Sequence, residues 1–186
     1  MSIVLQGSTS GSVTLQEPAV AGTTVLDLPS TSGTLDRTNR AGNVLQVVRS
    51  DYTTTTSTTN TSSWSNIGSA TITPSSSSNK ILITVNYHVS GIGAMRLLRN
   101  STALNTPSSN YMTYSKYPND NQGGWNANSD RQTVTMQIYD SPATTSSTTY
   151  NVEMIAYGIS GTTGFGVNEL HGSTTFSGIT LMEIAA

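Results

Sequence analysis

Apolar and polar residues alternate along several short stretches of the chain. In residues 80–89 apolar side chains occupy every second position, and Val134, Met136 and Ile138 repeat this spacing within residues 131–139. A period of two is typical of a β-strand with one face in the core and the other in water. No stretch shows a helical period. The pattern therefore predicts an all-β, antiparallel fold.

Other apolar stretches indicate further strands. They are short, and Pro, Gly, Asn and Ser separate them in the way that turn residues do. We expect these additional strands over residues 43–50, 69–73, 95–99, 110–117, 150–159, 165–170 and 175–184. The set corresponds to about the eight strands of a jelly-roll sandwich, which we place in residues 41–186.

Two of the expected strands, over residues 150–159 and 179–184, are apolar on both faces. A single sandwich normally wets the outer face of its strands, so the second face needs either a covering segment or a partner subunit. We favour a partner subunit because few residues remain to cover this face, and most oligomers are symmetric homomers. The residues predicted to form the subunit interface are Ile155, Tyr157, Met182 and Ile184.

Residues 1–40 follow a different pattern. Short apolar groups alternate with Gly and Ser, and Pro18 and Pro29 interrupt them, so the segment cannot form its own core. We expect an extended arm that becomes ordered by lying along other strands or other subunits. The apolar side chains that the arm offers for such contacts are Val13, Leu15, Val25, Leu26 and Leu28.

Charge is scarce in this chain. Charged residues make up 10% of the sequence and the formal net charge is −2, whereas about 25% of an average soluble domain is charged. Lys and Arg form no basic cluster, so we expect no nucleic-acid partner. The absence of cysteine excludes a disulfide framework and a thiolate metal site. No apolar run is long enough to cross a membrane and no secretory signal is visible, so we expect no membrane insertion and a cytosol-like compartment.

Residues that could carry catalysis or bind a metal ion are few. His88 falls on the polar face of an expected strand, and Glu169 lies two residues before His171 without any nucleophile motif. We therefore expect no enzyme activity and no cofactor. Residues 119–122 offer oxygen ligands for Ca²⁺, but Asp120 is their only carboxylate and a calcium site usually needs several.

Four aromatic residues flank the same loop. Rigid aromatic rings at a surface can stack on a sugar, which makes a glycan one candidate ligand for this loop. The alternative is a packed β-turn, and we weigh the two interpretations nearly equally. The four residues are Tyr111, Tyr114, Tyr117 and Trp125.

Glu183 lies inside the apolar strand over residues 175–184. A buried carboxylate has to be paired or protonated. We predict that Arg96 or Arg99, from the same or a neighbouring subunit, forms a charge pair with Glu183.

Several tracts follow one another in a specific order: GSVTLQEPAVAGTTVLDLP at residues 11–29, TITPS at 71–75, NKILI at 79–83, MRLLRNSTAL at 95–104, IYDSPATTSSTTYNV at 138–152 and GITLMEIAA at 178–186. In this order they resemble tailed-phage virion structural proteins whose C-terminal part is a trimeric jelly roll of the tumour-necrosis-factor and C1q type. The resemblance implies a homotrimer with one sheet of each subunit facing the threefold axis. It also implies a place on the outer surface of a virion assembled in the cytoplasm of a bacterial host.

Within that class we predict a capsid decoration or cement protein that binds the major capsid protein or another virion protein. Only residues 1–40 precede the jelly roll, whereas a tail fibre generally needs a docking region and a shaft before its head. The arm would then anchor the trimer to the virion. The alternative is a tail-fibre tip that recognises a host surface glycan. A carbohydrate-active enzyme is a third interpretation, which the missing pair of acids disfavours.

Overall fold

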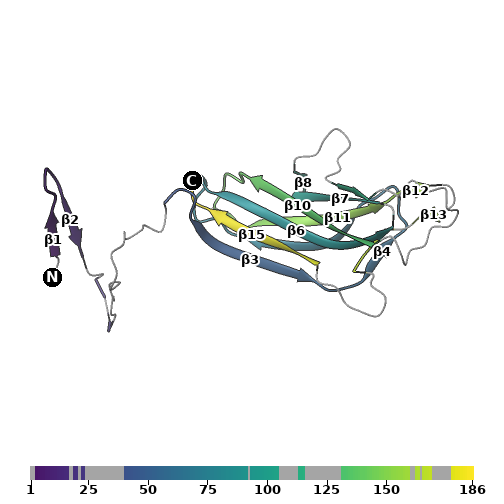
Figure 1. Ribbon diagram of the computed structural model, residues 1–186, viewed down its shortest axis with the longest axis horizontal. Coiled ribbons are helices and arrows are strands. Elements are labelled where there is room, and N and C mark those ends of the chain that lie inside the picture. Colours follow the sequence, from purple (N-terminus) through teal and green to yellow (C-terminus); the bar gives the residue numbers. More distant parts are fainter. Residues whose placement is uncertain are drawn as a thin grey trace. The chain divides into compact units, whose positions relative to one another are not determined.

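Two parts of the chain form separate units, Met1–Asp36 and Arg37–Ala186. The computed structural model describes residues 3–16, 19–20 and 22–23 of the first unit, and residues 40–91, 93–104, 113–115, 131–159, 162–163, 165–168 and 177–186 of the second. Every regular element among these residues is a β-strand, which confirms the all-β prediction (Figure 1).

The first unit contains a β-hairpin made of β1 (Ile3–Gln6) and β2 (Ser12–Leu15), drawn in purple in Figure 1. In its loop the backbone N–H of Gly7 donates a hydrogen bond to the carbonyl oxygen of Gly11 at 2.9 Å. Gly11 has a φ of 77°, a conformation that glycine adopts without the strain a side chain would cause. The sequence had predicted only an extended arm here, so the hairpin is an addition to that expectation.

The larger sheet of the second unit has four main rows of antiparallel strands in the order β3–β15–β6–β10. The short strand β14 pairs with the last residues of β6, beyond the part of β6 that pairs with β15. The short strand β4 pairs with β14. The bounds are β3 (Val44–Tyr52), β4 (Thr56–Thr58), β6 (Lys80–Gly91), β10 (Arg131–Asp140), β14 (Phe165–Val167) and β15 (Ser177–Ile184).

The smaller sheet is also antiparallel and has the order β5–β11–β7, with β8 and β9 both pairing with β7. A separate two-stranded ribbon joins β12 and β13. The bounds are β5 (Ser65–Ile72), β7 (Gly93–Arg99), β8 (Thr102–Ala103), β9 (Thr113–Ser115), β11 (Thr148–Ala156), β12 (Gly158–Ile159) and β13 (Thr162–Thr163).

The two sheets pack face to face around one hydrophobic cluster to which both contribute. Tyr87 of β6 is among the largest fully buried side chains, and its hydroxyl donates a hydrogen bond to the carbonyl oxygen of Ile67 at 3.3 Å. The core positions that alternation predicted in β6 and β10 are all buried: Ile81, Ile83, Val85, Tyr87, Val89, Val134, Met136 and Ile138. The predicted antiparallel, sandwich-like fold is confirmed to this extent.

The main strands pair in a nested pattern. In chain order they are β3, β5, β6, β7, β9, β10, β11 and β15. The outermost two in this order, β3 and β15, pair with each other. Moving inward, β5 pairs with β11, β6 with β10 and β7 with β9. Such nesting arises when a long antiparallel ribbon folds over on itself, so that strands far apart in the sequence become neighbours.

Candidate functional site: exposed apolar surfaces

The outer face of the larger sheet carries apolar side chains at the end where β3 begins and β15 ends. Met182 of β15 lies between Val47 of β3 and Leu82 of β6. Leu82 in turn lies opposite Tyr139 of β10, so one apolar row crosses the larger sheet from β3 through β15 and β6 to β10. Beyond this row, Val44 of β3 lies opposite Ile184 of β15. We call these residues the apolar band: Val44, Val47, Leu82, Tyr139, Met182 and Ile184.

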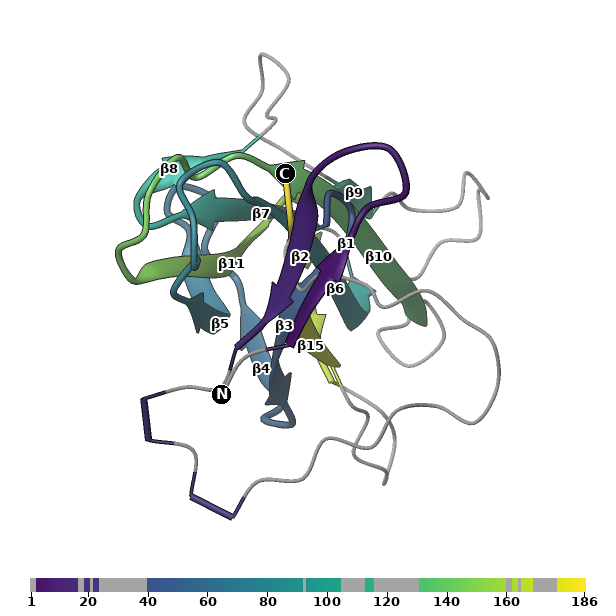
Figure 2. The same cartoon turned by 90° about the vertical axis from the view of Figure 1, so that its left-hand side faces the viewer.

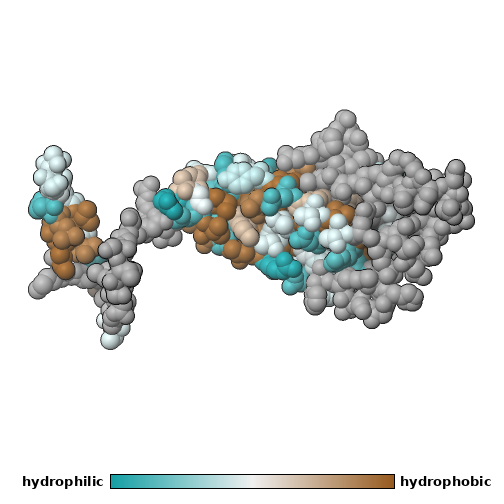
Figure 3. All heavy atoms as spheres, in the orientation of Figure 1, coloured by the Kyte–Doolittle hydropathy of each residue, from teal (hydrophilic) through white to brown (hydrophobic). Residues whose placement is uncertain are grey.

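Three members of the apolar band are largely open to water. Val44, Val47 and Tyr139 are 53%, 57% and 57% exposed, and the other members are partly buried. Figure 3 shows hydrophobic residues gathered over this end of β3 and β15. The outer face of a sandwich is normally polar, and a contiguous apolar patch indicates a surface that meets another surface.

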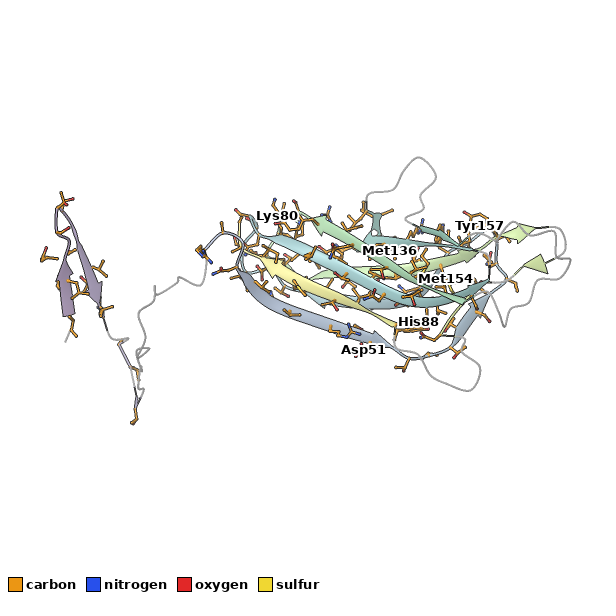
Figure 4. The ribbon with its side chains drawn as sticks, in the orientation of Figure 1. Asp51, Lys80, His88, Met136, Met154 and Tyr157 are labelled. Carbon is orange, nitrogen blue, oxygen red and sulfur yellow. The ribbon has the colours of Figure 1, made fainter. Side chains whose placement is uncertain are left out.

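The rest of the same outer face is polar, and its side chains bond to one another across the strands. The hydroxyl of Thr135 donates to Asn86 Oδ1 at 2.7 Å. His88 lies toward the other end of β6 from Lys80 (Figure 4). Its Nδ1 atom and the hydroxyl of Thr133 form a hydrogen bond of 3.0 Å. These polar groups satisfy one another within the sheet, which sets them apart from the apolar band.

The predicted subunit interface combined two strands that the structure places in different sheets. Met182 and Ile184 of β15 belong to the apolar band. Ile155 lies on β11 in the smaller sheet and is only 5% exposed, and Tyr157, just after β11, is partly buried. The four residues predicted to form the interface therefore do not lie on one sheet. Alternation shows which residues share a face of a strand, but it does not show which sheet the strand joins.

Four members of the apolar band were missed by sequence analysis. For two of them the signal was present, because Leu82 and Tyr139 interrupt the otherwise polar outer sides of β6 and β10. The structure shows that these two residues lie opposite each other. Val44 and Val47 carried no such signal. Val44 lies opposite Ile184 but Gln46 lies opposite Glu183, so a β-bulge gives β3 one extra residue here and interrupts its alternation.

A second exposed apolar surface lies on the β1–β2 hairpin, whose two strands are drawn in Figure 2. The register places Ile3 opposite Leu15 and Leu5 opposite Val13, so these side chains share one face. Each is between 51% and 61% exposed. We call these four residues the hairpin face. It includes Val13 and Leu15, two of the residues predicted to serve the arm.

Glu183 is fully buried on the inner side of β15, but its partners are neutral groups. Its carboxylate accepts hydrogen bonds from the backbone N–H and the hydroxyl of Ser75 at 2.7 and 2.8 Å, from Asn79 Nδ2 at 2.6 Å and from Gln46 Nε2 at 2.5 Å. Burial by itself raises the pKa of Glu183, but the hydrogen bonds from Asn79, Gln46 and Ser75 outweigh burial and hold this pKa below its usual value. The carboxylate thus ties β3 and residues 75–79 to β15.

The two arginines predicted to pair with Glu183 bind other acids. Arg96 Nη2 lies 2.6 Å from Glu153 Oε2 on the smaller sheet. Arg99 Nη1 donates to both carboxylate oxygens of Asp140, at 2.9 and 3.0 Å. The predicted charge pair with Glu183 is therefore wrong within the chain, because amide and hydroxyl donors already occupy the Glu183 carboxylate.

Several predicted site residues lie outside the described residues. Of the aromatic loop, only Tyr114 falls within a described element, β9. Among the residues that the structure describes, no three His, Asp or Glu side chains are grouped so that they could hold a metal ion, and no helix is long and apolar enough to span a membrane. The predicted residues outside the described ranges are Val25, Leu26, Leu28, Tyr111, Tyr117, Trp125, residues 119–122, Glu169 and His171.

No protein-family model matches the chain, and no curated protein matches it. Among the described residues, the apolar band and the hairpin face are the surfaces that bear on function.

Proposed function

We propose that this protein is a homotrimeric, non-enzymatic structural protein of a tailed-phage virion, and that it acts as a capsid decoration or cement protein. The virion role rests on the resemblance of the ordered sequence tracts. The observation that carries the assembly is the apolar band, which leaves apolar side chains exposed on a sheet that is otherwise polar outside.

The nested strand pairing supports a jelly roll as the fold of the second unit. In a jelly roll, an antiparallel ribbon of eight strands wraps into two sheets. This arrangement pairs the first strand with the last and each following strand with its counterpart from the other end, as is seen here. In the proteins that the sequence resembles, one sheet of each subunit faces the threefold axis. The larger sheet is the better candidate because it carries the apolar band, whereas the outer side of the smaller sheet includes Asn66, Asn151 and the pair of Arg96 with Glu153.

The apolar band offers a moderate free energy of association. Burying one aliphatic or aromatic side chain fully stabilises by about 1.5–3 kcal/mol. Val44, Val47 and Tyr139 are each a little over half exposed, so covering all three would contribute about 2.5–5 kcal/mol. Association itself costs about 4–15 kcal/mol. The apolar band would therefore form the centre of a subunit interface, and the polar rows beside it would have to contribute contacts as well.

The arm would attach the trimer to the major capsid protein or to another virion protein. The apolar residues of the arm that would make this contact include Val25, Leu26 and Leu28. An arm inserted between neighbouring capsid subunits would bury apolar and backbone groups across their boundary. It would thereby oppose expansion of the shell under the pressure of packaged DNA.

The mass of the full chain in solution tests the proposed self-association. Met182→Asp places a charge between Val47 and Leu82, and we expect it to convert trimers into monomers that keep the circular-dichroism spectrum of the folded chain. Ser69→Asp places the same charge at an exposed position of β5 on the smaller sheet and is the matched control. A wild-type monomer, or equal loss of trimer in both variants, would contradict the proposal.

A further inference from the structure

The hairpin face belongs to an element that is too small to stand alone. Its opposite face carries Val4, Gln6, Ser12 and Thr14, so only one side of the hairpin is strongly apolar. An isolated two-stranded hairpin is marginally stable at best in water, and it gains stability when an apolar surface packs on it. We therefore expect β1 and β2 to be stable where the hairpin face is covered.

The register arranges the hairpin face in two layers. Leu5 lies opposite Val13 in one layer, and Ile3 lies opposite Leu15 in the other. A twofold rotation about an axis perpendicular to the hairpin exchanges its two antiparallel strands. It brings Leu5 to the position of Leu15 and Ile3 to the position of Val13, so leucine replaces leucine and one β-branched residue replaces the other. The hairpin face thus presents the same pattern from either strand, which suits packing against identical copies.

The chemistry of the segment favours an uncharged apolar partner. Residues 1–16 contain no charged side chain. A surface that selects an acidic or basic partner carries complementary charges around its apolar centre, and this one has only neutral Gln, Ser and Thr around it. For the same reason, nothing in the segment's side chains repels a second copy.

The size of the hairpin face sets a further condition on its partner. It contributes four residues, whereas a stable interface between free proteins needs about 20–30 residues on each side. The hairpin face is therefore too small to capture a separate protein by itself. Copies that are already joined through their sandwiches avoid this difficulty, because contact within one assembly benefits from a high effective concentration.

We propose that the hairpin faces of three copies of this chain pack against one another within the homotrimer. Their two layers would form a small apolar core, with Leu5 and Val13 in one layer and Ile3 and Leu15 in the other. This inference rests on the proposed homotrimer and deepens the anchoring proposal. The hairpins join the three arms, which then attach to the virion as one unit through other apolar residues of the arm, among them Val25, Leu26 and Leu28.

Single-cysteine variants of the full chain test this contact, since the chain has no cysteine of its own. Leu5→Cys places a thiol on the hairpin face, and Thr14→Cys places one at an exposed position on the opposite face as the matched control. Trimers of each variant are oxidised mildly at low protein concentration. Non-reducing gels then show what fraction of the chains has become linked by a disulfide. We expect disulfide-linked pairs of chains to form several-fold faster in Leu5→Cys than in Thr14→Cys.

The outcomes separate the inference from the proposal on which it rests. A trimer in which both variants cross-link equally, or neither does, would overturn the hairpin contact and leave the homotrimer standing. A monomeric wild-type chain would overturn the homotrimer and the hairpin contact together.

Hydrogen exchange provides a second measurement that does not depend on cysteine. The amides of β1 and β2 should exchange several-fold more slowly in the wild-type trimer than in Leu5→Asp, because packed hairpins open less often. Equal exchange in the two trimers would also refute the hairpin contact.

Discussion

Replacing Glu183 with glutamine tests how a buried carboxylate holds one end of the sandwich together. The carboxylate accepts four hydrogen bonds, and three of them reach the same oxygen, Oε1. In Glu183→Gln the side-chain oxygen can keep the bonds from Ser75 and Asn79, but the new NH₂ group then faces the NH₂ group of Gln46. Gln46 can turn its amide to accept, but it would lose the bond that its Nε2 atom donates to Thr73 at 2.8 Å.

The expected loss of stability follows from these bonds. If Gln46 turns in this way, all four hydrogen bonds to residue 183 change from charge-assisted to neutral, which costs about 1 kcal/mol each, and the bond from Gln46 to Thr73, also about 1 kcal/mol, is lost. Removing the buried charge offsets part of this sum, so we expect a net loss of about 2–4 kcal/mol in the free energy of unfolding. For a chain of this size that corresponds to a decrease of roughly 4–16 °C in Tm.

The effect of Glu183→Gln should depend on pH. The pKa of Glu183 is lowered in the folded state from a usual value of 4.5. A group with a lowered pKa stabilises the fold fully above its unfolded pKa, and this contribution is lost as the pH falls through the folded pKa. The wild type should therefore lose stability below about pH 4.5, and its advantage over Glu183→Gln should shrink there.

Thermal unfolding of the full chain, followed by circular dichroism across this pH range, measures both effects. Glu153→Gln is the matched control, because Glu153 is partly exposed and pairs with Arg96 on the smaller sheet. We expect this control to lose no more than about 1 kcal/mol. If Glu183→Gln melts at the wild-type temperature at neutral pH, the account of the Glu183 hydrogen bonds is wrong.

Three further changes should alter stability in defined ways. Gly68→Ala would bring a Cβ atom into the hydroxyl of Tyr87 and should lower the free energy of unfolding by about 1–3 kcal/mol; adding Tyr87→Phe should recover part of this loss in denaturant titrations, and full additivity would contradict the contact. Asn168→Ala should cost about 3–5 kcal/mol, since the buried Asn168 has a φ of 58° and its Nδ2 donates to two backbone carbonyls at 2.8 and 3.2 Å; an unchanged denaturation midpoint would exclude this role. Burial raises the pKa of Tyr87 and of Tyr150 above the usual 10.0, so stability should be full below pH 10 and fall above it, and a wild-type chain whose Tm stays constant through that range would contradict these assignments.

The sequence predicted the inner faces of β6 and β10 correctly because a period of two is a local property. Ile83 and Met136 could be assigned to the core without knowing what packs on them. The sheet that each strand joins depends on partners far along the chain, and here local pattern failed. Ile155 and Met182 look alike in sequence, yet one lies in the smaller sheet and the other on the outer face of the larger sheet.

Glu183 shows the same limit at the level of a single site. Its burial follows from its place in an apolar strand, and the need for partners follows from its charge. The partners themselves, Asn79 and Gln46, are 104 and 137 residues away. Amide side chains are too common in this chain for two of them to stand out, whereas Arg96 and Arg99 are among its few cations. The sequence therefore predicted a charge pair, although neutral donors were sufficient.

The copy number of this protein in purified virions tests the central proposal most directly. Quantitative mass spectrometry would measure it relative to the major capsid protein of the same particles. A ratio near one to one is expected for a cement protein distributed over the capsid. A few to a few tens of copies per particle would contradict that role and favour a tail-fibre tip that binds a host receptor.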